Sequence, residues 1–191
     1  MFLPSDFRRP AELTAEQLQQ AARLVRLAMP HFYRTLPDDR SDAIIGMQLL
    51  QLGNELSECQ VSKSGETVTA VLCTYPSSEQ VDRQRCGLHQ FAGMLERHEL
   101  PIFFGHLNEL REQMVPISSE GQYLARFAVH EERQGTSLAS DLLGTLSRTV
   151  GCSTISLHVR SDNARALAFY KKQGFKFADT ALKDYRVMER R

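Results

Sequence analysis

The sequence predicts an α/β (α+β) domain in which helices cover a mixed β-sheet. The chain has 191 residues, the length of one domain, and its 42% hydrophobic content is typical of a globular protein. Its C-terminal half alternates strand-like and helix-like segments, an order that favours a helix-covered mixed sheet. We therefore expect a single domain over residues 1–191.

Charge and targeting signals narrow the function classes. The 23 basic and 23 acidic side chains cancel, whereas proteins that bind nucleic acid or acidic lipid usually carry a basic excess. No apolar run approaches the ~18 residues of a membrane-spanning helix, and residues 1–10 lack the apolar core of a signal peptide. We expect a cytoplasmic protein with no nucleic-acid or membrane partner.

The cysteines predict no metal site. Cys59, Cys73, Cys86 and Cys152 contain no C-x-x-C pair and have no nearby histidines at zinc-finger spacing. We interpret them as reduced, mostly buried thiols.

The N-terminal part predicts two helices and a hairpin. Thr14 and Gln17 fit a capping box, and apolar residues at helical spacing follow until Pro30. A second helix is expected over residues 40–54. Strands at 59–63 and 67–75 flank a polar turn with a glycine, which is typical of a β-hairpin.

Residues 79–114 predict a helical insertion, interrupted near Leu100–Pro101. Two interpretations stay open for it: a second packing layer, or a cover over a substrate pocket.

The C-terminal part predicts the remaining sheet. A strand is expected at 122–129, with Tyr123, Ala125, Phe127 and Val129 on one face, then a helix over 134–150 and a strand at 154–159. A helix over 163–173 ends at Gly174, a residue suited to a left-handed helix end. Residues 175–177 and 185–188 are expected to form closing strands.

The turn after the 122–129 strand carries the first chemical signal. A short polar loop follows Val129, and small residues around Gly135 then begin a helix. The first N–H groups of a helix have no partner inside it and attract anions, often a diphosphate. Neither the P-loop pattern nor the dinucleotide fingerprint G-x-G-x-x-G is present.

The second signal lies on the 163–173 helix. Asn163 and Tyr170 are seven residues apart and so share one helix face. Asn163 could be only a helix cap, and Tyr170 only a core aromatic with its hydroxyl at the edge.

Together these stretches resemble the GCN5-related N-acetyltransferase (GNAT) superfamily. The family's acyl-CoA motif, Gln/Arg-x-x-Gly-x-Gly/Ala, is matched by residues 134–139, with Ser137 where the middle glycine usually stands. The signature Asn-x-x-Ala-x-x-Phe/Leu-Tyr-x-x-x-Gly-Phe is matched in full over residues 163–175. The resemblance covers residues 122–177 and implies a mostly antiparallel mixed sheet with helices on both faces.

The resemblance also implies how an acyl-CoA would bind. The backbone of Phe127, Ala128 and Val129 would pair with the pantetheine arm, Asn163 would contact the cofactor, and Tyr170 would stand near its sulfur. The diphosphate would be held by Gln134, Gly135, Thr136, Ser137, Leu138, Ala139 and Ser140. A side chain at Ser137 adds a Cβ near the diphosphate and would make a positive φ costly there.

The implied activity is N-acyl transfer from acyl-CoA, with acetyl as the default group, to a primary amine, without a metal. Tyr170 would be the general acid, and the Val129 N–H would stabilise the oxyanion. Glu120 lies where family members often place a basic carboxylate; His130, His158 or water alone are alternatives. A non-catalytic CoA-binding sensor or interaction domain is the alternative function, and a homodimer is common in the family.

Overall fold

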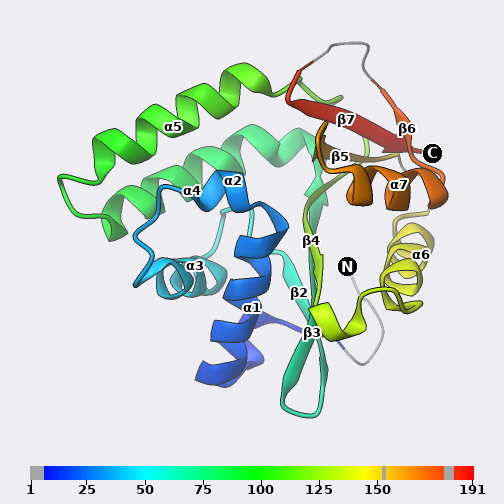
Figure 1. The fold of residues 1–191 in the computed structure, drawn as a ribbon, viewed down its shortest axis with the longest axis horizontal. Helices are drawn as coiled ribbons and strands as arrows, with labels where there is room; N and C mark the ends of the chain where they lie inside the picture. Colours follow the sequence, from blue (N-terminus) through cyan, green and yellow to red (C-terminus); the bar gives the residue numbers. More distant parts are fainter. Residues whose placement is uncertain (1–6, 152–153, 179–182) are drawn as a thin grey trace.

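The computed structural model describes residues 7–151, 154–178 and 183–191, and Figure 1 shows their fold. One mixed sheet divides the domain: α1 to α5 lie on one side of it, and α6 and α7 lie on the other. We call these sides the α1–α5 face and the α6–α7 face. Cys152 lies outside the described residues.

The sheet has seven strands in the order β1-β2-β3-β4-β5-β7-β6. All neighbouring strands are antiparallel except β4 and β5, which are parallel. The expected mixed, mostly antiparallel sheet with helices on both faces is therefore confirmed. The strands are β1 (Phe7–Arg8), β2 (Cys59–Ser64), β3 (Thr67–Pro76), β4 (Gln122–Val129), β5 (Ile155–Arg160), β6 (Lys176–Phe177) and β7 (Tyr185–Arg190).

The helices follow the predicted order, except that α2 was not predicted; nor was the short strand β1. The described α-helices are α1 (Ala15–Ala28), α2 (Pro30–Tyr33), α3 (Ser41–Leu50), α4 (Gln80–Met94), α5 (Leu100–Gln113), α6 (Leu138–Val150) and α7 (Ala164–Lys172). Short 3₁₀ turns precede α1, α4 and α6, at Pro10–Glu12, Ser77–Glu79 and Glu131–Arg133.

The N-terminal helices show where local chemistry sets a boundary. Both hydrogen bonds of the predicted capping box between Thr14 and Gln17 are present. The predicted 40–54 helix is shorter, because Asn54 builds a turn after it by accepting the N–H groups of Leu56 and Ser57. A side chain that binds nearby backbone groups in this way competes with helical hydrogen bonding.

The helical stretch between β3 and β4 consists of α4 and α5. The interruption lies at residues 95–99, before Leu100 rather than at the proline. Pro101 instead belongs to the first turn of α5. An N–H group has no helical partner at that position, so a proline costs little there.

A β-bulge overturns the predicted single face of β4. The register with β3 shifts between Cys73/Arg126 and Thr74/Leu124, which leaves Ala125 as the extra residue. Tyr123 and Ala125 consequently join the core cluster on the α1–α5 face, whereas Phe127 packs against the cluster on the α6–α7 face. An extra residue changes the alternation of side chains along a strand.

Candidate active site

The parallel strands β4 and β5 separate after a short contact. They pair only at Gln122/Ile155 and Tyr123/Ser156, and the residues beyond these pairs diverge. We call this divergence the fork. It exposes the edge of β4 toward β5, where unpaired backbone groups can bind another extended chain.

The register of β4 decides which backbone groups face the fork. The N–H of His130 donates to Thr69, so Val129 and Ala70 form a pair that does not exchange hydrogen bonds. Hydrogen-bonded and non-hydrogen-bonded pairs alternate along an antiparallel ladder. The main-chain groups of Phe127 and Val129 therefore point into the fork, whereas those of Ala128 face β3.

The bend between β4 and α6, residues 130–137, and the first turn of α6 leave several N–H groups available. Those of Gly135, Ser137, Ala139 and Ser140 form no hydrogen bond with any described residue. The Thr136 hydroxyl donates to the Arg133 carbonyl at 2.7 Å and accepts the Leu138 N–H at 3.3 Å. Helix α6 begins at Leu138 rather than at 134, so the bend is longer than the sequence indicates.

Side chains and one glycine hold the bend in place. Gln134 Nε2 donates to the Val129 carbonyl at 3.1 Å, which ties the bend back to the end of β4. Gly135 has φ +80°, a conformation that disfavours other residues. Ser137 has φ −69° and ψ −15°, so the side chain at the usual glycine position causes no backbone strain.

Helix α7 joins this arrangement from the same face. Gln173 Nε2 donates to Ser140 Oγ at 3.0 Å, and the Phe127 and Phe169 rings stack with their centroids 6.1 Å apart. These contacts connect α7 to α6 and to β4. The Asn163 side chain caps α7 by accepting the Ala166 N–H at 3.0 Å, as the simpler interpretation expected.

Tyr170 packs among aromatic rings on the α6–α7 face. Its ring makes edge contacts with Phe169 and Phe175, at centroid distances of 5.4 and 5.5 Å. Burial raises the pKa of the Tyr170 hydroxyl above its ordinary value. The group therefore keeps its proton at neutral pH and can act as a proton donor.

A cavity of about 450 Å³ lies on the α1–α5 face. Helices α4 and α5 and the chain after α5 form most of its wall. Arg126 of β4 and His158 of β5 also line it. Both residues lie beyond the last β4–β5 pair, on opposite arms of the fork, so the cavity extends to the fork.

Glu55 sits in the wall of this cavity and is buried. One carboxylate oxygen accepts the Tyr75 hydroxyl at 2.7 Å and the Gln84 amide at 3.2 Å. The other oxygen accepts a guanidinium N–H of Arg126 at 3.3 Å. Burial opposes the charge on Arg126, yet the facing Tyr33 and Glu55 side chains hold its pKa above the ordinary value.

His158 is oriented by two hydrogen bonds. Its Nε2 lies 2.7 Å from the Val115 carbonyl, and its Nδ1 lies 2.9 Å from the Tyr123 hydroxyl. A carbonyl only accepts, so Nε2 carries a hydrogen, and in the neutral ring Nδ1 accepts from the Tyr123 hydroxyl. Burial raises the pKa of Tyr123 above its ordinary range, which keeps this hydroxyl protonated.

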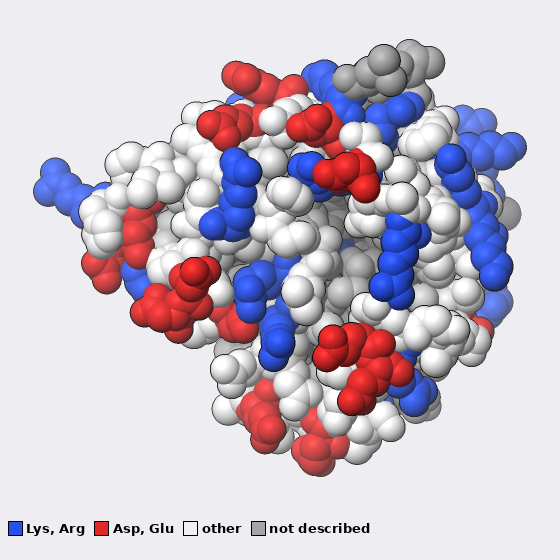
Figure 2. All heavy atoms as spheres, in the orientation of Figure 1, with Lys and Arg blue, Asp and Glu red and all other residues white. Residues whose placement is uncertain are grey.

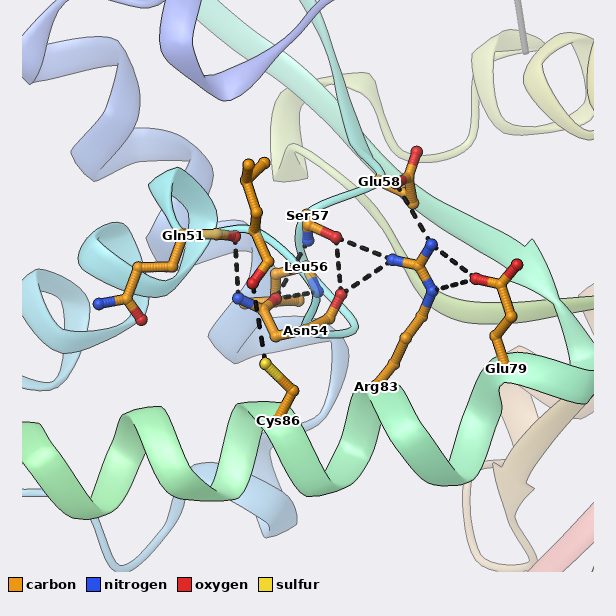
Figure 3. A network of polar contacts seen from close by, with 9 residues as sticks. Gln51, Asn54, Leu56, Ser57, Glu58, Glu79, Arg83 and Cys86 are labelled. Atoms are coloured by element: carbon orange, nitrogen blue, oxygen red, sulfur yellow. Dashed lines mark hydrogen bonds and ion pairs between the residues drawn. The ribbon is translucent and has the colours of Figure 1, made fainter.

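A polar network fixes α4 against the chain that leads into β2 (Figure 3). Arg83 of α4 reaches Ser57 Oγ, the Asn54 carbonyl, and the carboxylates of Glu58 and Glu79. The turn held by Asn54 contains Glu55, so this network also places the Glu55 carboxylate relative to α4.

Two sequence candidates for the base lie elsewhere. Glu120 is exposed just before β4, where its N–H is 3.2 Å from Ser118 Oγ, and it is not among the residues that line the cavity. His130 begins the bend, where its Nδ1 accepts the Glu132 N–H at 3.4 Å. The structure brings neither residue to the cavity.

Three other features of the described residues bear on further sites: the surface charge, the helices and the potential metal ligands. Acidic and basic side chains are interspersed over much of the face in Figure 2. None of the described helices combines the length and apolar character that a membrane crossing requires. The described residues contain no group of three His, Cys, Asp or Glu side chains placed to hold a metal ion.

Sequence reasoning missed most of the cavity wall, including Glu55 and Arg126. The one available signal was an arginine inside the apolar 122–129 strand, because a charge in a buried strand needs a partner. Nothing local marked Glu55, since its contacts come from residues 20 to 71 positions away.

Solved structures of acetyltransferases share this fold. An N-acetyltransferase from Staphylococcus aureus Mu50 has a TM-score of 0.71 at 17% identity, covering 96% of this chain and 99% of that one. A further acetyltransferase has a TM-score of 0.64 at 18% identity, with 96% and 97% covered. The PaiA N-acetyltransferase from Thermoplasma acidophilum, in complex with coenzyme A, has 0.52 at 15% identity, with 97% of both chains covered.

The fold is thus the one that these acetyltransferase structures have. The family model for the acetyltransferase (GNAT) family matches residues 22–175. The chain belongs to this family. A search of curated proteins finds no match.

Proposed function

We propose that this protein is an N-acyltransferase that moves an acyl group, acetyl by default, from acyl-CoA to a primary amine. The observation that carries the proposal is the fork between β4 and β5. The β4 arm leads to the bend, where N–H groups are available, and on the α1–α5 face the fork meets the cavity. A thioester held at the bend can reach an amine in the cavity only through such an opening.

The residues of the bend fit a CoA diphosphate. In this proposal the N–H groups of Gly135, Ser137, Ala139 and Ser140 bind its oxygens, as helix N-termini bind anions. The Gln134 side chain and Thr136 hold the bend, Leu138 starts the helix, and Asn163 contacts the cofactor. Phe127 and Val129 bind the pantetheine amides through the backbone, while Ala128 keeps β4 paired with β3.

The chain's own groups then move the protons. Acetyl-CoA supplies an acyl group activated as a thioester. The Val129 N–H donates to the carbonyl oxygen as it gains negative charge. Tyr170 gives its hydroxyl proton to the departing sulfur and regains one from solvent. The C–N bond forms first and puts the negative charge on the thioester carbonyl oxygen, and the C–S bond breaks as the carbonyl is restored.

We assign the amine's proton to the Tyr123–His158 pair. The amine gives its proton to Nδ1 of His158, which lines the cavity, and the Tyr123 hydroxyl then turns to accept a hydrogen bond from the imidazolium. The hydrogen bond between these groups and the place of His158 in the cavity wall support this route. Glu120, predicted as the base from the family resemblance, remains the competing assignment.

Thiol release from acetyl-CoA across a panel of primary amines tests the proposal. Amine-dependent release supports acyl transfer. The alternative, a non-catalytic CoA-binding sensor or interaction domain, predicts a melting-temperature shift with CoA but no release with any amine. At ~100-fold excess over Kd, one-site binding stabilises the folded state by about 2.7 kcal/mol. The cytoplasmic location and a homodimer stay predictions.

A further inference from the structure

We propose that the acceptor is a primary amine on an apolar alkyl or aryl body without a second positive charge, and that the cavity under α4 and α5 binds this body. The inference rests on the proposed function and names the substrate class of the same site.

The lining of the cavity is mainly apolar. A volume of about 450 Å³ lies within the ~300–1,000 Å³ that small-molecule sites span. Apolar side chains from α2, α4 and α5 and from the turn before β2 form much of the wall: Phe32, Leu56, Leu88, Phe91, Phe104 and Leu107. Such a lining binds an apolar body and leaves a buried charge without a partner.

The charges in the wall disfavour a polycation. Among the described residues that line the cavity, Glu55 is the only carboxylate, against the guanidinium groups of Arg111 and Arg126. Both Glu55 oxygens are already engaged, by Tyr75 and Gln84 on one side and by Arg126 on the other. A second ammonium group would therefore meet an apolar wall and a net positive charge.

The position of the fork sets the orientation of the acceptor. Arg126 and His158 stand where the cavity meets the fork, so the amine nitrogen lies at that end, beside His158. The body then extends away from the sheet toward Phe104 and Leu107 of α5. This arrangement leaves the acyl group on the fork side and the acceptor's body under the two helices.

An amine series tests the inference. With acetyl-CoA fixed, kcat/KM should rise by roughly fourfold for each added methylene from propylamine to hexylamine, the gain expected for burying a CH₂ group. Replacing hexylamine with 1,6-diaminohexane adds only a terminal ammonium. This change should lower kcat/KM by at least ~100-fold, because the charge must enter the apolar wall.

A parallel series varies the acyl group instead. With propylamine fixed, acetyl-CoA is compared with butanoyl-, hexanoyl- and octanoyl-CoA. The proposal predicts no gain with acyl length. A gain on the acyl side, without one on the amine side, would show that the cavity holds the acyl chain and would overturn the proposal.

Two substitutions on α5 provide a matched pair. Phe104 lines the cavity and is 37% exposed, whereas Ile102 is 61% exposed and does not line it. Phe104→Ala should flatten the amine-length dependence, and Ile102→Ala should leave it unchanged. Both side chains are partly exposed, so neither change should prevent folding.

The outcomes separate the two levels of the proposal. No thiol release with any amine would contradict the proposed function itself. Release that is equal for propylamine and hexylamine, or that is fastest for the diamine, would leave the function standing and overturn the acceptor class. An unchanged length dependence in Phe104→Ala would remove this cavity as the site.

Discussion

The two faces of the sheet divide the work of the proposed reaction, and they are built in different ways. On the α6–α7 face the site is contiguous: β4, the bend and the start of α6 follow one another in the chain. On the α1–α5 face the cavity wall collects residues from Phe32 to His158. The first face offers backbone N–H groups, which few substitutions remove, whereas the second depends on side chains.

This difference has a functional consequence. Backbone groups recognise the part of acyl-CoA that is the same for every acyl donor, so cofactor binding on the α6–α7 face depends mainly on the conformation of the bend. Side chains on the α1–α5 face can change without disturbing the bend, because only the fork connects the two sites. Apart from the proton-transfer residues Tyr170 and His158, we therefore expect substitutions on the first face to act on cofactor binding and substitutions on the second to act on acceptor choice.

The largest expected effect lies on the α6–α7 face. Tyr170→Phe should lower kcat by about 10²- to 10⁴-fold, the usual contribution of a general acid, while the Kd of acetyl-CoA stays the same. Since burial raises the Tyr170 pKa above its ordinary value of about 10, the acid stays protonated through neutral pH. In the wild type, the alkaline loss of kcat that reports this group should begin only above pH 10.

Tyr185→Phe, on β7 and not among the residues that line the cavity, is the control and should retain kcat. If kcat of Tyr170→Phe equals that of the wild type, with chemistry shown to limit the rate, Tyr170 is not the acid.

The next-largest effect is a loss of stability at the point where the fork begins, which both faces share. A Cβ on Gly121, which has φ +87°, would lie 2.2 Å from the Thr154 carbonyl oxygen, beside the first β4–β5 contact. Gly121→Ala should therefore reduce the free energy of unfolding by about 3 kcal/mol, measured by denaturant titration, because a strained backbone and a backbone collision combine.

Gly135→Ala, in the bend on the α6–α7 face, is the matched comparison for Gly121→Ala. Its φ is +80°, but a Cβ would meet no atom within 4 Å. Only the backbone cost of roughly 1–2 kcal/mol applies. A loss in Gly135→Ala as large as that in Gly121→Ala would contradict the picture of an open bend.

A substitution of His158 tests the proposed general base on the α1–α5 face. His158→Gln should lower kcat/KM by roughly 100-fold, as expected for loss of a general base, and should remove one ionisation from the pH–rate profile. Glu120→Gln should change neither quantity. The reverse pattern, with Glu120→Gln inactive and His158→Gln active, would return the base to the carboxylate before β4.

The smallest effect is expected at Ser137. Ser137→Gly restores the usual family residue, yet the Kd of CoA by calorimetry should stay the same, because Ser137 already has a negative φ. A clear gain in affinity would mean that the Ser137 side chain obstructs the diphosphate, and that the bend must rearrange to bind it.

The same contrast explains what the sequence could predict. Local rules operate within a few residues, so the Thr14 cap, the limits of β4 and the Asn163 cap of α7 were predictable. The bulge at Ala125 was not, because it is a mismatch between two strands and leaves no pattern in either one. The identity of the cavity wall also depends on how distant elements pack.

The predicted site shows the same limit. The bend and its available N–H groups follow from a strand that runs into a helix, and the match at residues 134–139 located them. By contrast, the Glu55–Arg126 pair joins residues 71 positions apart, and the Tyr123–His158 hydrogen bond joins residues 35 apart. Pairing of this kind depends on the order of strands in the sheet.

In the proposed reaction, a cofactor on one face of the sheet and an amine on the other meet at the fork. The most direct test is the calorimetric Kd of a conjugate in which an acetyl bridge joins the CoA sulfur to the nitrogen of hexylamine. Our account predicts that it binds at least ~100-fold more tightly than CoA alone, because the alkyl body is buried in addition, and that Phe104→Ala removes much of the gain. Equal affinity of the conjugate and CoA would contradict it.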